Sequence, residues 1–207
     1  MPLDSSSPGN DSNEPLVELD AHRLEAFSDS VMAVIITIMA FDLKTPMSAD
    51  LHGLQGRVPS ILVYILSFTF VGIYWNNHHH LLRATRRISG AVMWTNLHLL
   101  FWLSLIPFAT AWVGTAHASA LPASVYGVVA LGAALAYFAL VRSILRANVD
   151  DSAIARAVGR DVKGILSPII YAGAIALAFV SPYISYGCYA VVAIIWFVPD
   201  RRLAKVA

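Results

Sequence analysis

Six stretches of mostly apolar residues, each long enough to cross a lipid bilayer, constrain the fold of this chain most. A transmembrane helix needs about 20 such residues. The chain offers them at about 24–43, 58–82, 88–113 and 118–141, and twice within 164–199. Ser181-Pro182 divides the last stretch, because proline lacks an amide donor and disfavours helix in the residue before it. The sequence therefore predicts an all-α integral membrane fold with six transmembrane helices, the last two forming a tight hairpin.

The composition supports a membrane protein. Of the 207 residues, 57% are hydrophobic and 13% are charged, whereas a soluble domain has roughly 45–50% apolar and about 25% charged residues. A soluble core of this size could not bury so much apolar surface, so the lipid bilayer must act as part of the solvent. The net charge of +1 predicts no nucleic-acid partner.

The two ends of the chain differ from the spans between them. Residues 1–20 contain five acidic residues and no Lys or Arg. They are predicted to form a disordered acidic tail, followed by a six-helix domain over 21–200 and a basic tail over 201–207. Of the fourteen Lys and Arg, twelve fall on the side of the six spans that carries both ends. The positive-inside rule therefore predicts a multi-pass protein with both termini in the cytoplasm.

The first span carries two stripes at three- and four-residue steps. One stripe is small and suited to close helix contact, and it comprises Ser30, Ala33, Thr37 and Ala40. The other is bulky and apolar, and it continues from Phe27 through Val31, Val34, Ile38 and Phe41. By themselves the residues favour the simplest interpretation of the bulky stripe, a surface that faces lipid or a neighbouring helix.

Polar residues inside the spans indicate where function lies. Asp29 lies about one and a half turns inside the first span, where a lone carboxylate is costly and usually paired. Arg23 and Glu25 precede it. A metal or haem site could be drawn from His78, His98 and Asp29, but HExxH, CxxC and a histidine pair at i, i+4 are absent from the sequence. We expect hydrogen bonds between helices instead, with no metal and no cofactor.

Signatures of catalysis are also absent from the sequence. It contains no GxSxG nucleophile elbow and no Walker loop, which predicts that the protein is not an enzyme. It likewise lacks a TVGYG-like filter of backbone carbonyls, which excludes a conventional potassium-channel filter.

Three motifs occur in order along the six-span body. The segment RLEAFSDSVMAVIITIMAFDL carries Arg-x-x-x-Phe-Ser-Asp, the second span carries Trp-x-x-His-His, and the third carries NLHLLFWLSLIPFAT. Together they resemble the transmembrane protein 175 family of lysosomal and bacterial potassium channels. The resemblance implies a single-repeat bacterial member that forms a homotetramer in the plasma membrane, with the first helices lining a central pore. Potassium and other monovalent cations would then be permeant ions rather than cofactors.

The resemblance also implies roles for particular residues. A structural polar network would comprise Arg23, Phe27, Ser28, Asp29, Trp75, His78 and Asn96. The apolar constriction would fall on Val34, and Thr37 would belong to the pore layer implicated in cation preference. Ile38 and Phe41 become further pore-lining residues.

Three departures from the family pattern qualify these roles. Val34 is smaller than the usual Ile or Leu, which predicts a wider constriction. Phe41 is bulkier than the usual aliphatic residue and is a second candidate for the narrowest point. Leu82 stands where the second-span motif often has Phe.

The leading hypothesis is a potassium-permeable cation channel that conducts passively and is gated by apolar rings. The first alternative is a proton-coupled secondary transporter that uses Asp29 and His78 as a relay. The sequence disfavours it, because no pair of discontinuous helices and no second buried carboxylate is evident. The second alternative is a membrane-bound metal or haem protein.

Overall fold

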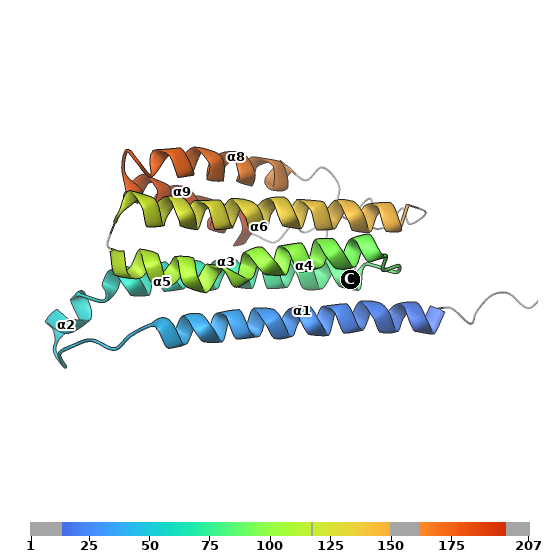
Figure 1. The fold of residues 1–207 in the computed structure, drawn as a ribbon, viewed down its shortest axis with the longest axis horizontal. Helices are drawn as coiled ribbons and strands as arrows, with labels where there is room; N and C mark the ends of the chain where they lie inside the picture. Colours follow the sequence, from blue (N-terminus) through green and yellow to red (C-terminus); the bar gives the residue numbers. More distant parts are fainter. Residues whose placement is uncertain (1–13, 117, 150–161, 198–207) are drawn as a thin grey trace, which may run out of the picture.

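The computed structural model describes residues 14–116, 118–149 and 162–197, and every regular element in these ranges is a helix. The predicted all-α fold is confirmed. The long helices run side by side along the molecule, with α1 at one edge and α8 at the opposite edge (Figure 1). The helices are α1 (Glu14–Asp42), α2 (Leu51–Gln55), α3 (Val58–Arg83), α4 (Gly90–Ser104), α5 (Ile106–Ala116), α6 (Ala120–Ala147), α8 (Val162–Leu177) and α9 (Pro182–Phe197).

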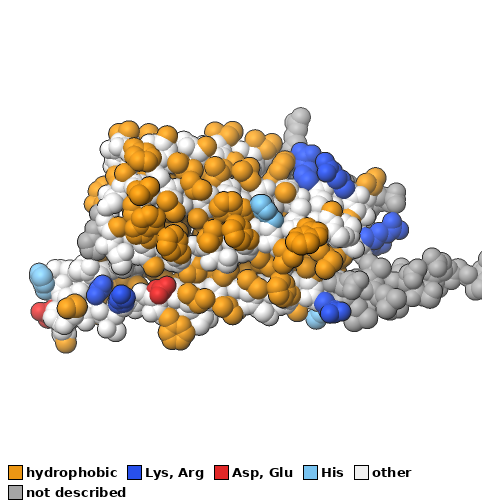
Figure 2. All heavy atoms as spheres, in the orientation of Figure 1, with side chains coloured by type: hydrophobic (Ala, Val, Ile, Leu, Met, Phe, Trp, Pro, Cys, Tyr) orange, Lys and Arg blue, Asp and Glu red, His pale blue; other side chains and the backbone are white. Residues whose placement is uncertain are grey.

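Four helical segments are long and apolar enough to cross a membrane, and each overlaps one of the first four predicted spans. They are Ala21–Asp42, Val58–Arg83, Gly90–Ala116 and Ala120–Ala147. The third segment combines α4 and α5, which are separated at Leu105, two residues before Pro107. Apolar side chains cover the middle of the molecular surface in Figure 2, and Lys and Arg gather nearer its two ends. This distribution is typical of a membrane protein.

The last two predicted spans form shorter helices. α8 and α9 have 16 residues each, so each is about 24 Å long, compared with about 30 Å for the hydrocarbon core. The predicted break at Ser181-Pro182 is confirmed, because α8 ends at Leu177 and α9 begins at Pro182. The two helices pack against each other as the expected hairpin.

The first helix begins earlier than the sequence pattern predicts. α1 begins at Glu14, so this helix includes residues that the composition assigns to the disordered tail. The rest of that tail and the basic tail over 201–207 lie outside the described residues. The short helix α2 was not predicted. Its N-cap is Asp50, whose carboxylate accepts a hydrogen bond from the Gly53 amide at 2.8 Å.

α6 is the central helix of the bundle, since it packs against α4, α5, α8 and α9. Small residues allow these neighbours to approach closely. A Cβ atom at Gly132 would overlap the ring of Trp102 on α4, so only glycine fits at this position without movement of the indole. Leu99, Leu103 and Ile106 are fully excluded from solvent in the adjoining core.

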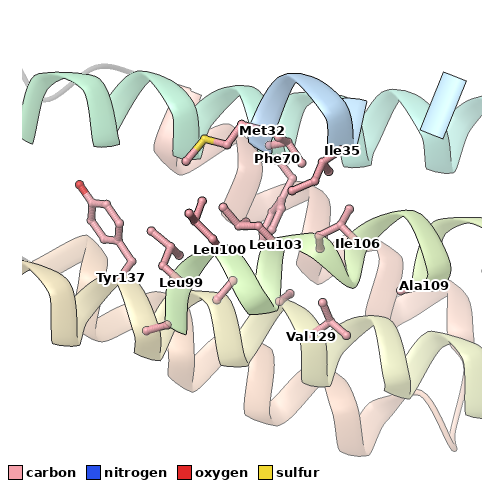
Figure 3. Close-up of a cluster of buried hydrophobic side chains, with 14 of the residues drawn as sticks. Met32, Ile35, Phe70, Leu99, Leu100, Leu103, Ile106, Ala109, Val129 and Tyr137 are labelled. Atoms are coloured by element: carbon pink, nitrogen blue, oxygen red, sulfur yellow. The ribbon is translucent and has the colours of Figure 1, made fainter. Parts of the chain in front are cut away.

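α1 packs against α3, α4 and α5 through one face only. The buried residues on this face are Ser28, Met32, Ile35 and Met39, spaced by four, three and four positions. Figure 3 shows Met32 and Ile35 beside Phe70, Leu100 and Leu103. The small stripe predicted for close contact is exposed instead, at Ser30, Ala33, Thr37 and Ala40. Among the described residues the face with Met32, Ile35 and Met39 is the one that packs, so the small stripe stays exposed.

Candidate functional site

The outer face of α1 is a mostly apolar surface that the other described residues leave exposed. Its large side chains are Phe27, Val34, Ile38 and Phe41, with 51%, 56%, 45% and 84% of their surface exposed. Thr37 lies on the same face, and its hydroxyl donates to the Ala33 carbonyl at 2.8 Å. That bond uses the only proton of the hydroxyl, so the oxygen lone pairs remain available to a ligand.

A chain of buried hydrogen bonds fastens the inward face of α1 to α3 and α4. Asn96 on α4 donates from Nδ2 to Ser28 Oγ at 2.9 Å, and its Oδ1 lies 2.7 Å from His78 Nε2 on α3. Since Oδ1 can only accept, His78 donates from Nε2. Ser28 in turn donates to the Leu24 carbonyl at 2.8 Å. Ser28, His78 and Asn96 are all completely excluded from solvent.

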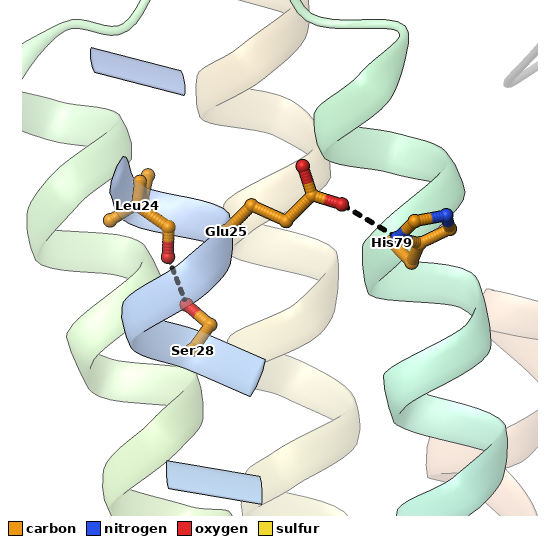
Figure 4. Close-up of polar contacts among 4 residues, drawn as sticks. All are labelled: Leu24, Glu25, Ser28 and His79. Atoms are coloured by element: carbon orange, nitrogen blue, oxygen red, sulfur yellow. Dashed lines mark hydrogen bonds and ion pairs between the residues drawn. The ribbon is translucent and has the colours of Figure 1, made fainter. Parts of the chain in front are cut away.

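Beside this chain, two carboxylates of α1 meet a histidine of α3. Glu25 Oε1 lies 2.6 Å from His79 Nδ1 (Figure 4). Asp29, one helical turn after Glu25, brings a carboxylate oxygen to the same place, and the ligand atoms of the three residues lie within 4.8 Å of one another. Trp75 stacks on the His79 ring at 5.9 Å between centroids, with an angle of 24° between the planes.

The structure brings together only part of the residue set that the sequence associates with a polar network. Ser28, His78 and Asn96 form one hydrogen-bonded chain. Arg23 is exposed, and no described contact joins it to Asp29. Phe27 and Trp75 lie at the surface rather than among these hydrogen bonds, with about half of each residue exposed.

Sequence reasoning missed the contact between Glu25 and His79. One available signal is the spacing of Glu25 and Asp29, because residues four apart lie on the same face of a helix. Among three consecutive histidines, however, no local pattern shows which ring faces α1. The selection of His79 depends on the register between two helices.

A second polar cluster lies farther along α1. Thr110 on α5 donates to Ser67 on α3 at 2.7 Å, and Ser67 Oγ lies 3.1 Å from the Tyr126 hydroxyl on α6. A cavity of about 140 Å³ is lined in part by Thr110, and its other polar lining residues include Asp42, Lys44, Arg57, Ser60 and Thr115. This cluster joins α3, α5 and α6, whereas α1 contacts it through Met39.

Comparison with known proteins points to one family. The family model for the endosomal/lysosomal potassium channel TMEM175 matches residues 23–107. A potassium channel from Chryseobacterium sp. (strain P1-3) is 47% identical over 183 residues, covering 88% of this chain and 95% of the relative. A potassium channel from Streptomyces collinus is 32% identical over 203 residues, covering 89% of this chain and 98% of the relative.

A solved structure has the same fold. The crystal structure of a lysosomal potassium-selective channel TMEM175 homolog from Chamaesiphon minutus superposes with a TM-score of 0.75 and 28% sequence identity. The match covers 86% of this chain and 97% of that one. The likeness therefore extends beyond the signature of the first span to nearly the whole described bundle.

Proposed function

The chain belongs to the TMEM175 family of ion channels, and we propose that it is itself a multi-pass, potassium-permeable channel that conducts passively along α1. The family is one of channels rather than enzymes. The observation that carries the proposal is the mostly apolar outer face of α1, which the described residues leave exposed while they bury the opposite face. Lipid alone does not require the small residues and the Thr37 hydroxyl that lie beside the apolar ones.

We place four copies of α1 around a central axis in a homotetramer. The small stripe from Ser30 to Ala40 allows the four helices to approach closely. Val34, Ile38 and Phe41 then form apolar rings, and such constrictions can gate ions because water enters them reluctantly. The four Thr37 oxygens are the polar ligands that cations would meet between these rings.

The proposed topology has six spans, with α8 and α9 as the last two. A helix shorter than the hydrocarbon core is accommodated by local thinning of the bilayer at modest cost. The distribution of Lys and Arg supports cytoplasmic termini, and the likeness to single-repeat bacterial channels supports a plasma-membrane location. In this arrangement the hydrogen bonds among Ser28, Asn96 and His78 hold α1, the proposed pore helix, against α3 and α4.

A proton-coupled transporter is the second candidate function. The observation in its favour is that the Glu25 carboxylate lies close to Asp29. It supplies a second carboxylate beside the proposed proton relay of Asp29 and His78, which the sequence pattern did not indicate. Uphill substrate movement driven by an imposed pH gradient would support a transporter, whereas a channel only dissipates gradients.

Ion flux in liposomes tests the proposal. The purified chain is reconstituted under a potassium gradient, with valinomycin defining complete release and protein-free liposomes defining leak. Val34→Ser should raise the flux, because it wets an apolar ring. Ile169→Ser is the matched control, since Ile169 is 63% exposed on α8, at the edge of the molecule opposite α1. Absence of potassium flux from folded, tetrameric protein would contradict the channel proposal.

A further inference from the structure

The cluster of Glu25, Asp29 and His79 has the composition and geometry of a metal site. It offers two carboxylates from α1 and one imidazole from α3, all within 4.8 Å of one another. A zinc ion bound at about 2.0–2.2 Å requires neighbouring ligand atoms about 3.4 Å apart in tetrahedral geometry. The His79–Glu25 distance of 2.6 Å must therefore open slightly, and Asp29 must close slightly.

Asp29 provides a separate reason to expect a cation. One of its carboxylate oxygens is excluded from solvent and accepts no hydrogen bond from any described residue. A carboxylate so placed within a membrane span is costly unless a positive group meets it. Arg23 is exposed and makes no described contact with it. A divalent cation between Glu25 and Asp29 would satisfy the orphaned oxygen and offset the repulsion between the two carboxylates.

We propose that Glu25, Asp29 and His79 bind a divalent transition-metal ion of the zinc class. The imidazole favours zinc over Mg²⁺ and Ca²⁺, which prefer oxygen ligands. Trp75 stacks on His79 and so fixes the orientation of the ring before the ion arrives. Three protein ligands leave a fourth position for water, as in open zinc sites.

Such an ion would join two helices that have different places in the molecule. Glu25 and Asp29 lie on α1, whose outer face is the proposed pore surface, and His79 lies on α3. A metal bridge would restrain movement of α1 relative to α3. This consequence rests on the proposed function, whereas metal binding itself does not.

Zinc binding to the purified full-length chain, carrying no affinity tag, tests the site directly. Isothermal titration gives stoichiometry and affinity, and cobalt(II) in place of zinc gives a visible spectrum that reports imidazole and carboxylate ligation. The test variants are Glu25→Gln and His79→Gln. His80→Gln is the matched control because it changes the neighbouring histidine on the same helix. Glu25→Asp retains a carboxylate, and helical circular dichroism with size-exclusion profiles verifies that each variant is folded.

The expected result is about one zinc per chain in the parent and in His80→Gln. Binding should weaken by at least about tenfold in Glu25→Gln and His79→Gln, as metal-site changes do even outside the direct ligands, with a smaller loss in Glu25→Asp. Absence of zinc binding, equal binding in all variants, or an equal loss in His80→Gln would overturn the site. In liposomes, zinc should slow potassium flux in the parent but not in His79→Gln. Absent flux contradicts the channel, whereas absent zinc binding contradicts the metal site.

Discussion

Asn96 is the side chain on which the connection among α1, α3 and α4 depends. Asn96→Ala removes the bond to Ser28 at 2.9 Å and the bond to His78 at 2.7 Å. Hydrogen bonds between membrane helices contribute about 0.6 kcal/mol on average and up to about 1.7 kcal/mol, so two contribute about 1–3 kcal/mol. The buried His78 N–H would also lose its acceptor, which costs about 1–3 kcal/mol. Because both figures count the His78 bond, the expected loss of stability is about 2–4 kcal/mol.

Equilibrium unfolding in mixed micelles measures this loss, with helical circular dichroism followed as the fraction of SDS rises. Asn76→Ala is the matched control, since Asn76 is exposed on α3. Ser28→Ala and the double variant complete a cycle that isolates the bond between Ser28 and Asn96. If Asn96→Ala destabilises the protein no more than Asn76→Ala does, the hydrogen bonds among Ser28, Asn96 and His78 do not hold α1 in place, and the reasoning is refuted.

Three further predictions follow from close packing and from the outer face of α1. Gly132→Ala should destabilise the protein by about 1–3 kcal/mol, because the added Cβ overlaps the Trp102 ring. Gly173→Ala is the control: it lies in open space on α8 and should be neutral or slightly stabilising. Equal losses of stability for the two variants in micelle unfolding would contradict this. Thr37→Val should lower the ratio of potassium to sodium flux in liposomes by removing the only hydroxyl proposed between the apolar rings, and an unchanged ratio would exclude that role. Phe41→Ala should raise potassium flux if Phe41 narrows the pore, and unchanged flux would place the constriction elsewhere.

The parts of the fold that depend on local chemistry were predictable from the sequence. The second span was expected over 58–82, and α3 covers Val58–Arg83. The break before Pro182 was also predictable, because the apolar stretch over 164–199 is too long for one span and proline disfavours helix in the residue before it. Proline alone does not determine a break, since α8 continues through Pro168. The length of the apolar stretch, which needs no knowledge of neighbouring helices, showed which proline divides it.

The face by which α1 packs was not predictable, for a physical reason. Met32, Ile35 and Met39 are buried, while Val34 and Ile38 are about half exposed, yet these five side chains have similar transfer free energies into lipid and into protein. In water, apolar periodicity separates a buried face from a solvated one. In a bilayer both faces of a helix are apolar, so the same periodicity carries no orientation.

Polar residues must therefore supply the orientation that apolar periodicity cannot. Ser28 has one partner side chain on α4, and Glu25 has one on α3, so together they define both the rotation of α1 and its height against its neighbours. Once these contacts form, Val34, Ile38 and Phe41 can only point away from the bundle. The contacts of Ser28 and Glu25 thus determine which apolar residues of the first span remain for a pore. A change at Ser28 or Asn96 should therefore alter conduction as well as stability.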